Sequence, residues 1–292
     1  MELSPQTFAE LRAVIRRLCG VVVPEEKAYL IQHRLGPVAR RHGCRSFAEL
    51  VTKLRGPQAA QLYEPVIEAI TTKETSFFRD GHPFEAFRRH LLPRLAEGVR
   101  TRRARARIWC AAASTGQEPY SLAMLVHDYV TAGQSPGTTA DAFEILATDI
   151  SPRALAAATA AEYSERDVAR GLTPDQVRRF FQKTARGWVV QDGLRKLVEF
   201  RRLNLAQPFP SLGAFDLIFC RNVLIYFDTD TRQQICQRFY DCLRPGGYLL
   251  LGSAENLYGV TDRFESLRFG ESLVYRKKPA AGPAPPASPA AP

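Results

Sequence analysis

The first 70 residues place apolar side chains at the spacing of α-helices. In the first segment, apolar residues recur at intervals of three and four: Phe8, Leu11, Ile15 and Leu18. Gly20 follows as a helix stop signal. Three further segments favour helices, and no strand pattern interrupts them: residues 25–42, 46–54 and 58–70. The pattern therefore predicts a small all-α domain over residues 1–80.

From Arg107 onwards the pattern changes, because short apolar runs alternate with helical stretches. The runs that predict strands are "RIWCAA", "FEILATD", "LVEFRRLNL", "FDLIFC", "GYLLLGS" and "SLVYRKK". Such alternation is typical of a parallel sheet with helices on both faces, and ligands bind beyond the carboxyl ends of its strands. We place this α/β domain over residues 108–278, with a small β insertion at about 180–200.

Charge is concentrated in one segment between these domains. The net charge is +10, and residues 81–107 hold eight arginines and two glutamates. We interpret this segment as a basic helical linker with a solvated face. A surface that meets an acidic partner is the alternative, and charge alone also leaves nucleic acid open.

Composition narrows the class of protein. The last 14 residues contain only Pro, Ala, Gly and Ser, so we expect a disordered tail over 279–292. No apolar run approaches the roughly 20 residues of a membrane span, and the acidic, amphipathic start is unlike a signal peptide. The six cysteines form no C-x-x-C pair, which favours reduced thiols, a cytoplasmic location and no metal site.

The stretch "ASTGQEPYS" follows the first predicted strand and suggests a ligand-binding turn. Gly116 would allow the tight turn, and the alanines before it would let backbone approach a ligand. Glu118 offers a carboxylate to a cationic group and would repel a pyrophosphate. The alternative is structural, because Thr115 and Glu118 also have the spacing of a capping box.

Two further strands end in polar residues. Asp149 ends the second predicted strand, where a carboxylate can accept hydrogen bonds from ribose hydroxyls. The structural alternative is that Asp149 is an acidic residue near the N-terminus of a helix that begins after Ser151. Arg221 and Asn222 end the strand run "FDLIFCRN". Tyr226 follows four residues later and could reach the same ligand cleft; the alternative is that it packs in the core. These strand ends point to an adenosine-type ligand.

Four blocks together resemble the chemoreceptor glutamate methyltransferases, the CheR family: "TTKETSFFRD", "IWCAAASTGQEPYS", "FCRNVLIYFD" and "LRPGGYLLLGSAEN". The resemblance implies an all-α N-terminal domain and a Rossmann-like S-adenosylmethionine methyltransferase sheet with a small β insertion. It implies methyl transfer from S-adenosylmethionine, which becomes S-adenosylhomocysteine, to glutamates on receptor signalling helices. We further expect a cytoplasmic monomer that neither inserts into membranes nor binds nucleic acid.

The resemblance also implies roles for particular residues. Thr75 and Arg79 would contact the cofactor from the N-terminal side, and Glu118 would bind its amino group. Asp149 would hold the ribose, and Asn204 and Leu205 would flank the adenine. Arg221 and Asn222 would line the floor of the cleft. Tyr226, with Arg79, would lie near the transferred methyl. Many family members have Asn where this chain has Lys73, so that contact is not carried over.

The chemistry implied by the resemblance requires no strong base. A glutamate side chain has an unperturbed pKa of about 4.3 and is already a nucleophile at neutral pH. Positioning and desolvation remain for the protein, and an arginine and a tyrosine hydroxyl can aim a carboxylate. Two other functions stay open: an RNA methyltransferase, suggested by the basic segment, and a signalling module that binds the cofactor without turnover.

Overall fold

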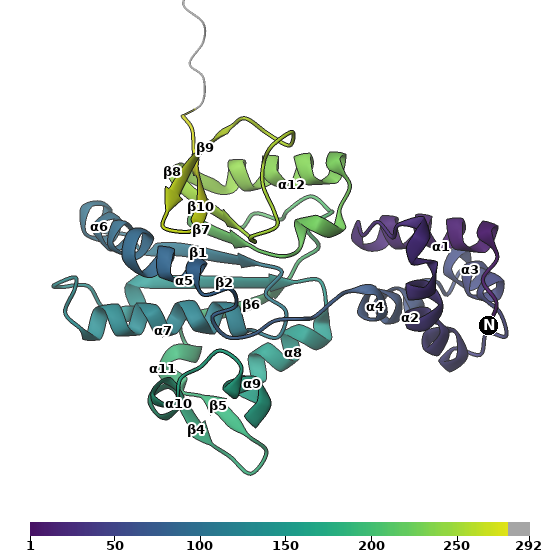
Figure 1. Cartoon of the computed structure of the whole chain (residues 1–292), viewed down its shortest axis with the longest axis horizontal. Coiled ribbons are helices and arrows are strands. Elements are labelled where there is room, and N and C mark those ends of the chain that lie inside the picture. The colour runs from purple at the N-terminus through teal and green to yellow at the C-terminus, as the bar shows by residue number, and fades with distance from the viewer. Residues whose placement is uncertain (280–292) are drawn as a thin grey trace, which may run out of the picture.

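The computed structural model describes residues 1–279, so the predicted tail lies outside the described residues from position 280 onwards. The chain forms a helical N-terminal unit and an α/β unit, which an extended segment joins (Figure 1). No helix among the described residues is long and apolar enough to span a membrane.

The N-terminal unit consists of helices packed around their own core. Its elements are α1 (Pro5–Cys19), η1 (Glu25–Lys27), α2 (Ala28–Arg41), α3 (Phe47–Arg55) and α4 (Ala60–Ile70). Ser4 accepts a hydrogen bond from the Thr7 amide at the start of α1, and Gly20 ends the helix with a left-handed φ of 74°. Leu11, Ile15 and other apolar residues of the predicted helical stripes form the buried core. The predicted all-α domain is confirmed.

The α/β unit is built on a seven-stranded sheet in the order β6-β2-β1-β7-β8-β10-β9. Its strands are β1 (Ala106–Ala111), β2 (Phe143–Asp149), β6 (Val198–Arg202), β7 (Phe215–Cys220), β8 (Leu243–Leu251), β9 (Phe264–Phe269) and β10 (Ser272–Lys277). The first five in the order are parallel, and β10 pairs antiparallel with both of its neighbours, β8 and β9. The predicted Rossmann-like fold is confirmed.

Helices cover both faces of this sheet. Alternate residues of β1 point to opposite faces, so that Ile108 and Cys110 belong to one hydrophobic core and Trp109 and Ala111 to another. The first core is covered by α5 (His82–Ala86), the π-helical turn η2 (Phe87–Leu91), α6 (Leu92–Arg102) and α7 (Gln117–Thr131). The second is covered by α12 (Thr229–Cys242), while α8 (Pro152–Ala160) lies beside β2 and β6.

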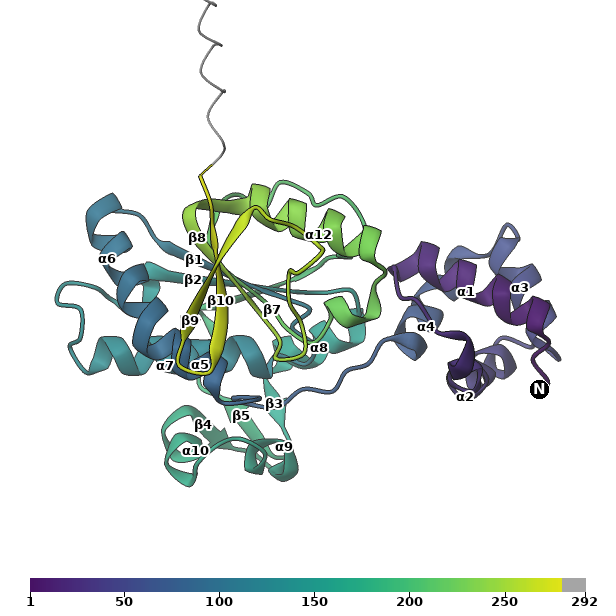
Figure 2. The same ribbon diagram turned by 45° about the horizontal axis from the view of Figure 1, so that its top comes forward.

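Residues 81–107 are helical as expected, but they do not form a linker. Five large side chains of the segment are buried against the sheet: Phe84, Phe87, Leu91, Leu92 and Leu95. These apolar residues alternate with the arginines at helical spacing and form one apolar face. The many arginines in the sequence concealed that face. The chain that crosses between the two units is instead the segment 71–76, which precedes Phe77 in the core of the α/β unit (Figure 2).

Several arginines of this segment have acidic partners nearby. Glu85 pairs with Arg88 and Arg89, and Glu97 pairs with Arg100. The last residues of the segment run into β1, so Arg102, Arg103 and Arg105 lie at the amino end of the parallel strands. β1 has six residues, so its two ends are about 20 Å apart.

The β insertion begins and ends earlier than predicted. It is a small antiparallel sheet in the order β3-β5-β4, made of β3 (Glu162–Tyr163), β4 (Phe181–Lys183) and β5 (Trp188–Val190). Three short helices accompany it: α9 (Glu165–Ala169), α10 (Pro174–Phe180) and α11 (Asp192–Arg195). The run at 198–202 belongs instead to the main sheet as β6. A two-residue strand such as β3 is too short to show alternation in the sequence.

The two units are in close contact where α1 ends. A Cβ atom added to Gly20 would lie 2.6 Å from Cβ of Ala206 and 2.9 Å from the ring of Phe227. The amide of Val22 donates to the carbonyl of Tyr226 over 2.9 Å. Because only glycine fits at position 20, the N-terminal unit approaches the carboxyl ends of the strands closely.

Candidate active site

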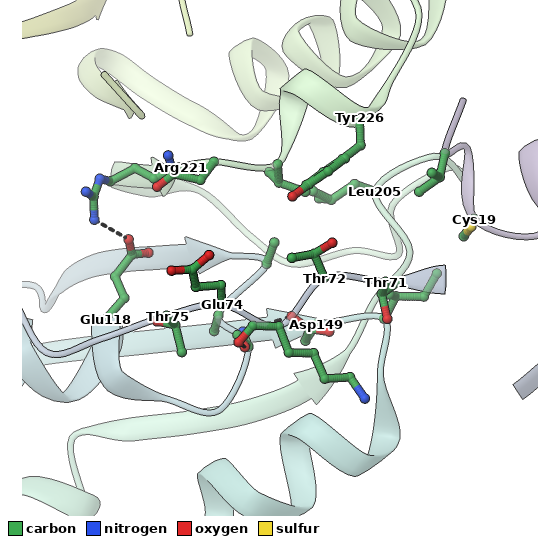
Figure 3. A pocket seen from close by; sticks show the side chains of 18 of the residues that line it. Cys19, Thr71, Thr72, Glu74, Thr75, Glu118, Asp149, Leu205, Arg221 and Tyr226 are labelled. Carbon is green, nitrogen blue, oxygen red and sulfur yellow. Dashed lines mark hydrogen bonds and ion pairs between the residues drawn. The ribbon is translucent and has the colours of Figure 1, made fainter. Parts of the chain in front are cut away.

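A pocket opens where the carboxyl ends of the parallel strands meet the N-terminal unit (Figure 3). The residues that follow β1, β2, β6 and β7 line it, together with residues 70–76 and the end of α1. All nine side chains singled out in the sequence lie in its wall: Thr75, Arg79, Glu118, Asp149, Asn204, Leu205, Arg221, Asn222 and Tyr226. The fold thus gathers residues that are up to 151 positions apart.

The turn between β1 and α7 holds strained backbone. Ala112 and Ser114 have left-handed φ values of 65° and 51°, and Gly116 has a φ of 95°. A Cβ on Gly116 would lie 2.9 Å from the Tyr163 hydroxyl oxygen, so glycine is required there for both conformation and space. Strain of this kind persists where the surrounding structure enforces it, often at a ligand site.

Glu118 does not serve as the capping-box residue that its spacing allowed. The N-cap of α7 is Gly116, and no side chain caps the helix. The Glu118 carboxylate instead accepts from Nη1 of Arg221 over 3.0 Å. Burial raises the pKa of Glu118 above its ordinary value, and the Arg221 guanidinium opposes that shift.

Asp149 combines the two roles that the sequence left open. Its Oδ2 accepts from the amide of Ser114 over 2.8 Å, and its Oδ1 accepts from the amide of Ser151 over 2.9 Å. Ser151 is the N-cap of α8, so the carboxylate joins that helix start to the β1–α7 turn. Burial raises the pKa of Asp149, and the two amide donors act against it. Each oxygen keeps a lone pair for a ligand.

Arg221 is a buried clamp between segments. Its Nη2 donates to the carbonyl of Arg79 over 2.8 Å and to the carboxylate of Asp80 over 2.7 Å, while Nη1 binds Glu118. Only 2% of the side chain is exposed. The guanidinium therefore positions both Glu118 and the segment that carries Arg79, a role that the sequence did not indicate.

Arg79 and Asn204 also contact the protein itself. Nη1 of Arg79 donates to the carbonyl of Glu74 over 2.8 Å. The Asn204 side-chain amide donates to the carbonyl of Leu18 over 2.9 Å and so ties the end of β6 to α1. Leu205 beside it is buried in the core under α12. The side-chain amide of Asn204 is thus engaged in docking the two units.

Tyr226 points its hydroxyl into the pocket, across from Asp149 and Glu118 (Figure 3). Within the described part of the chain the hydroxyl makes no hydrogen bond, and the side chain is half-buried outside the two hydrophobic cores. A core aromatic would be enclosed by apolar side chains, so the structural alternative for Tyr226 does not hold. Thr75 lies in the opposite wall.

Lys73 has turned away to an acidic partner. Its ammonium pairs with Glu68, whose other carboxylate oxygen accepts from the Ser151 hydroxyl over 2.5 Å. Glu68 therefore joins the end of α4 to the start of α8, and the ammonium of Lys73 balances its charge.

Glu255 and Asp80 are residues of the site that the sequence did not point out. The buried carboxylate of Glu255 accepts hydrogen bonds from backbone amides of residues 222–225. Asp80 holds Arg221. A buried glutamate directly after an apolar strand, in "GSAEN", is the signal that could have indicated Glu255.

Comparisons with known proteins agree with this geometry. The family model described as "CheR methyltransferase, SAM binding domain" matches residues 73–272, and "CheR methyltransferase, all-alpha domain" matches residues 6–71. Chemotaxis protein methyltransferase 1 of Pseudomonas aeruginosa is 39% identical over 279 residues, which cover 95% of this chain and 100% of that protein. Chemotaxis protein methyltransferase Cher2 of Pseudomonas putida is 37% identical, with 93% and 98% covered.

Among solved structures, the N-methyltransferase NodS from Bradyrhizobium japonicum, in complex with S-adenosyl-L-homocysteine, is similar with a TM-score of 0.37. It is 17% identical, and the match covers 68% of this chain and 89% of that one. At that TM-score the match adds nothing to the family models.

Proposed function

The chain belongs to the CheR methyltransferase family, and on that premise we propose that it converts glutamate side chains of chemoreceptor signalling helices to methyl esters. Its cofactor is S-adenosylmethionine. The family models cover both the helical and the α/β unit, and the relatives are named chemotaxis protein methyltransferases. The family models and the names of the relatives indicate a methyltransferase, and the glutamate acceptor is our proposal.

The donor groups of the pocket fit this cofactor. Asp149 has free lone pairs for a ribose diol, and the buried Glu118 carboxylate suits an ammonium group. The strained turn at Ala112–Ser114 brings backbone to the pocket wall. Leu205 adds apolar surface for a flat base. We assign Thr75, Arg79, Asn204, Arg221 and Asn222 to the remaining contacts of the cofactor.

When bound, S-adenosylmethionine supplies an electrophilic methyl group, which an acceptor carboxylate oxygen takes while the electron pair of the broken C–S bond stays on sulfur. The acceptor is ionised at neutral pH, so no residue has to remove a proton. Arg79 presents its guanidinium to the acceptor carboxylate, and the Tyr226 hydroxyl donates a hydrogen bond to it. The protein thereby contributes orientation and exclusion of water.

One observation carries the proposal for the acceptor. The Tyr226 hydroxyl and Arg79 line the pocket together, and the hydroxyl has no hydrogen-bond partner among the described residues. A donor that faces open space can serve a substrate without first breaking a contact within the protein. The free hydroxyl and the guanidinium N–H groups that Arg79 does not give to Glu74 suit a carboxylate better than an amine acceptor, which would itself bring donors.

The test is a methylation assay with radiolabelled S-adenosylmethionine and cytoplasmic receptor fragments from the source organism. We expect label on the fragments that mild alkali releases as methanol, because carboxyl methyl esters are alkali-labile whereas N-methyl groups are not. Fragments with their acceptor glutamates replaced by alanine serve as the control. Label on total RNA but not on the fragments would favour an RNA methyltransferase. Cofactor binding without label on any acceptor would favour a non-catalytic module.

A further inference from the structure

Glu255 binds the backbone of the loop at residues 222–226, which carries the pocket residues Asn222 and Tyr226. It follows strand β8, and only 9% of it is exposed. Its Oε2 accepts from the amides of Asn222 over 2.7 Å and Gly252 over 2.8 Å. Its Oε1 accepts from the amides of Val223 over 2.9 Å and Leu224 over 2.7 Å. One buried carboxylate thus satisfies at least four backbone donors.

The loop adopts a conformation that needs such a partner. Asn222 has a left-handed φ of 58°, and successive amides from 222 onwards converge on the carboxylate as in an anion-binding nest. Asn222 begins the loop, and Tyr226 ends the short helix η4 (Leu224–Tyr226) that follows. Both line the pocket, so the backbone that Glu255 holds is the backbone from which they project.

Gly252 shows how closely these groups are packed. A Cβ atom at this position would lie 2.7 Å from Oε2 of Glu255 and 2.8 Å from the amide nitrogen of Asn222. Gly252 does not have a left-handed φ, so it is the lack of space and not the backbone conformation that calls for glycine. The close packing at Gly252 therefore confines the Glu255 carboxylate to one position.

We propose that Glu255 is a positioning residue for methyl transfer, acting through the backbone of residues 222–225 to place Asn222 against the cofactor and Tyr226 against the acceptor. The part that concerns Tyr226 rests on the proposed function, whereas the part that concerns Asn222 requires cofactor binding alone. A glutamine could not replace Glu255, because its NH2 group would face amide donors in place of an acceptor oxygen.

A double-mutant cycle on binding of S-adenosylhomocysteine tests the proposal. Calorimetry compares the wild type, Glu255→Gln, Asn222→Ala, the double variant and, as the matched control, Glu2→Gln, an exposed glutamate that precedes α1, whose other end reaches the pocket. We expect Glu255→Gln to weaken binding at least about tenfold, Glu2→Gln to leave it unchanged, and the double variant to bind about as weakly as the weaker single one. A merely structural glutamate would lower the melting temperature, and its effect on affinity would be absent or additive, which would overturn the proposal.

Gly252→Ala keeps the test decisive if Glu255→Gln does not fold. It leaves the carboxylate in place but pushes it away from the Asn222 amide, and we expect it to weaken binding in the same direction. Wild-type affinity in Gly252→Ala would overturn the proposal. Since the assay contains no methyl acceptor, a failure of receptor methylation would leave this result intact, and the two proposals can fail separately.

Discussion

Nη1 of Arg221 lies 3.0 Å from Oε2 of Glu118, and the two side chains are only 2% and 12% exposed. The pair sits at the inner end of the pocket, where Arg221 is also bound to Asp80. The guanidinium is therefore shared between two carboxylates and neutralises neither completely. An ammonium group of a ligand would complete the charge balance at Glu118.

The first prediction concerns pH. Burial raises the pKa of Glu118 above its ordinary 4.5, so a proton competes with the cofactor ammonium at a higher pH than at an exposed glutamate. We expect affinity for S-adenosylhomocysteine to fall as the pH is lowered from neutral, measured by calorimetry between about pH 8 and pH 5. Glu118→Gln should bind more weakly with a shallower slope. Asp149, whose pKa burial also raises, supplies the slope that remains.

The same shift has the opposite sign for the stability of the free protein. A carboxyl group whose folded pKa is raised binds more protons when folded, so its contribution to stability decreases as the pH rises from the ordinary to the raised pKa. Cofactor affinity and the contribution of these two carboxyl groups to the stability of the free protein should therefore respond to acid in opposite directions. Affinity that is constant down to pH 5 would count against a contact of Glu118 with the ligand ammonium.

The second prediction is that Asp149→Ala weakens cofactor binding about 10- to 100-fold. Each lost hydrogen bond to a charged acceptor costs about 1.5–3 kcal/mol, and 1.4 kcal/mol corresponds to a factor of ten. The variant also leaves the amides of Ser114 and Ser151 without their partner, so the melting temperature should fall. Asp149→Asn, which keeps the volume, is the control. Unchanged affinity in calorimetry would remove Asp149 from the cofactor site.

The third prediction is that Tyr226→Phe lowers turnover at least about tenfold, equivalent to roughly 1.4 kcal/mol of barrier. The substitution removes a hydroxyl that bonds nothing in the described protein, so melting temperature and cofactor affinity should stay near the wild-type values. Single-turnover methylation on the same preparation decides the point. Wild-type turnover would exclude a part for the hydroxyl in the reaction.

The fourth prediction separates charge from geometry at Arg79. Arg79→Lys keeps the positive charge but loses the planar fork that binds a carboxylate through two bonds. We expect at least about a tenfold loss of turnover, because a lysine cannot both replace the 2.8 Å contact with the Glu74 carbonyl and aim an acceptor. A lower melting temperature with full turnover per folded molecule would instead show that Arg79 only holds its own segment.

The fifth prediction concerns the basic segment. Arg103 and Arg105 are exposed and precede β1, at the opposite end of the sheet from the pocket. Exchanging both for glutamine should change receptor methylation less than about twofold at about 0.1–0.15 M salt, since exposed charges are then screened over about 8–10 Å. A loss that is large at low salt and small at high salt would show that the receptor also contacts this end of the molecule.

The sequence predicted those parts of the site that lie at the ends of apolar strands. Asp149 and Asn222 each follow such a run, and the order of the strands brings their carboxyl ends to one edge. Gly116 could be recognised because a tight turn before a helix requires it. Local signals of this kind depend only on neighbouring residues, which is why they can be seen in one sequence.

The remaining features depend on partners that are distant in the chain. Glu255 binds amides 30 or more positions away, and Arg221 reaches Asp80 over 141 positions. No local pattern encodes these pairings. The helical segment 82–102 was misjudged for another reason, since its many arginines hid a continuous apolar face. The packing of this face against the sheet depends on strands that come later in the chain, so it is visible only in the folded structure.

The pocket takes one wall from the helical unit and the other from the sheet, so on the proposed site the methyl donor would link the two units thermodynamically. A ligand that needs both walls binds only the docked arrangement, so it adds RT ln(1 + [L]/Kd) to the free energy of docking. At a hundred times Kd this amounts to about 2.7 kcal/mol. We therefore expect depletion of the cofactor to loosen the contact between α1 and the sheet, where Gly20 lies.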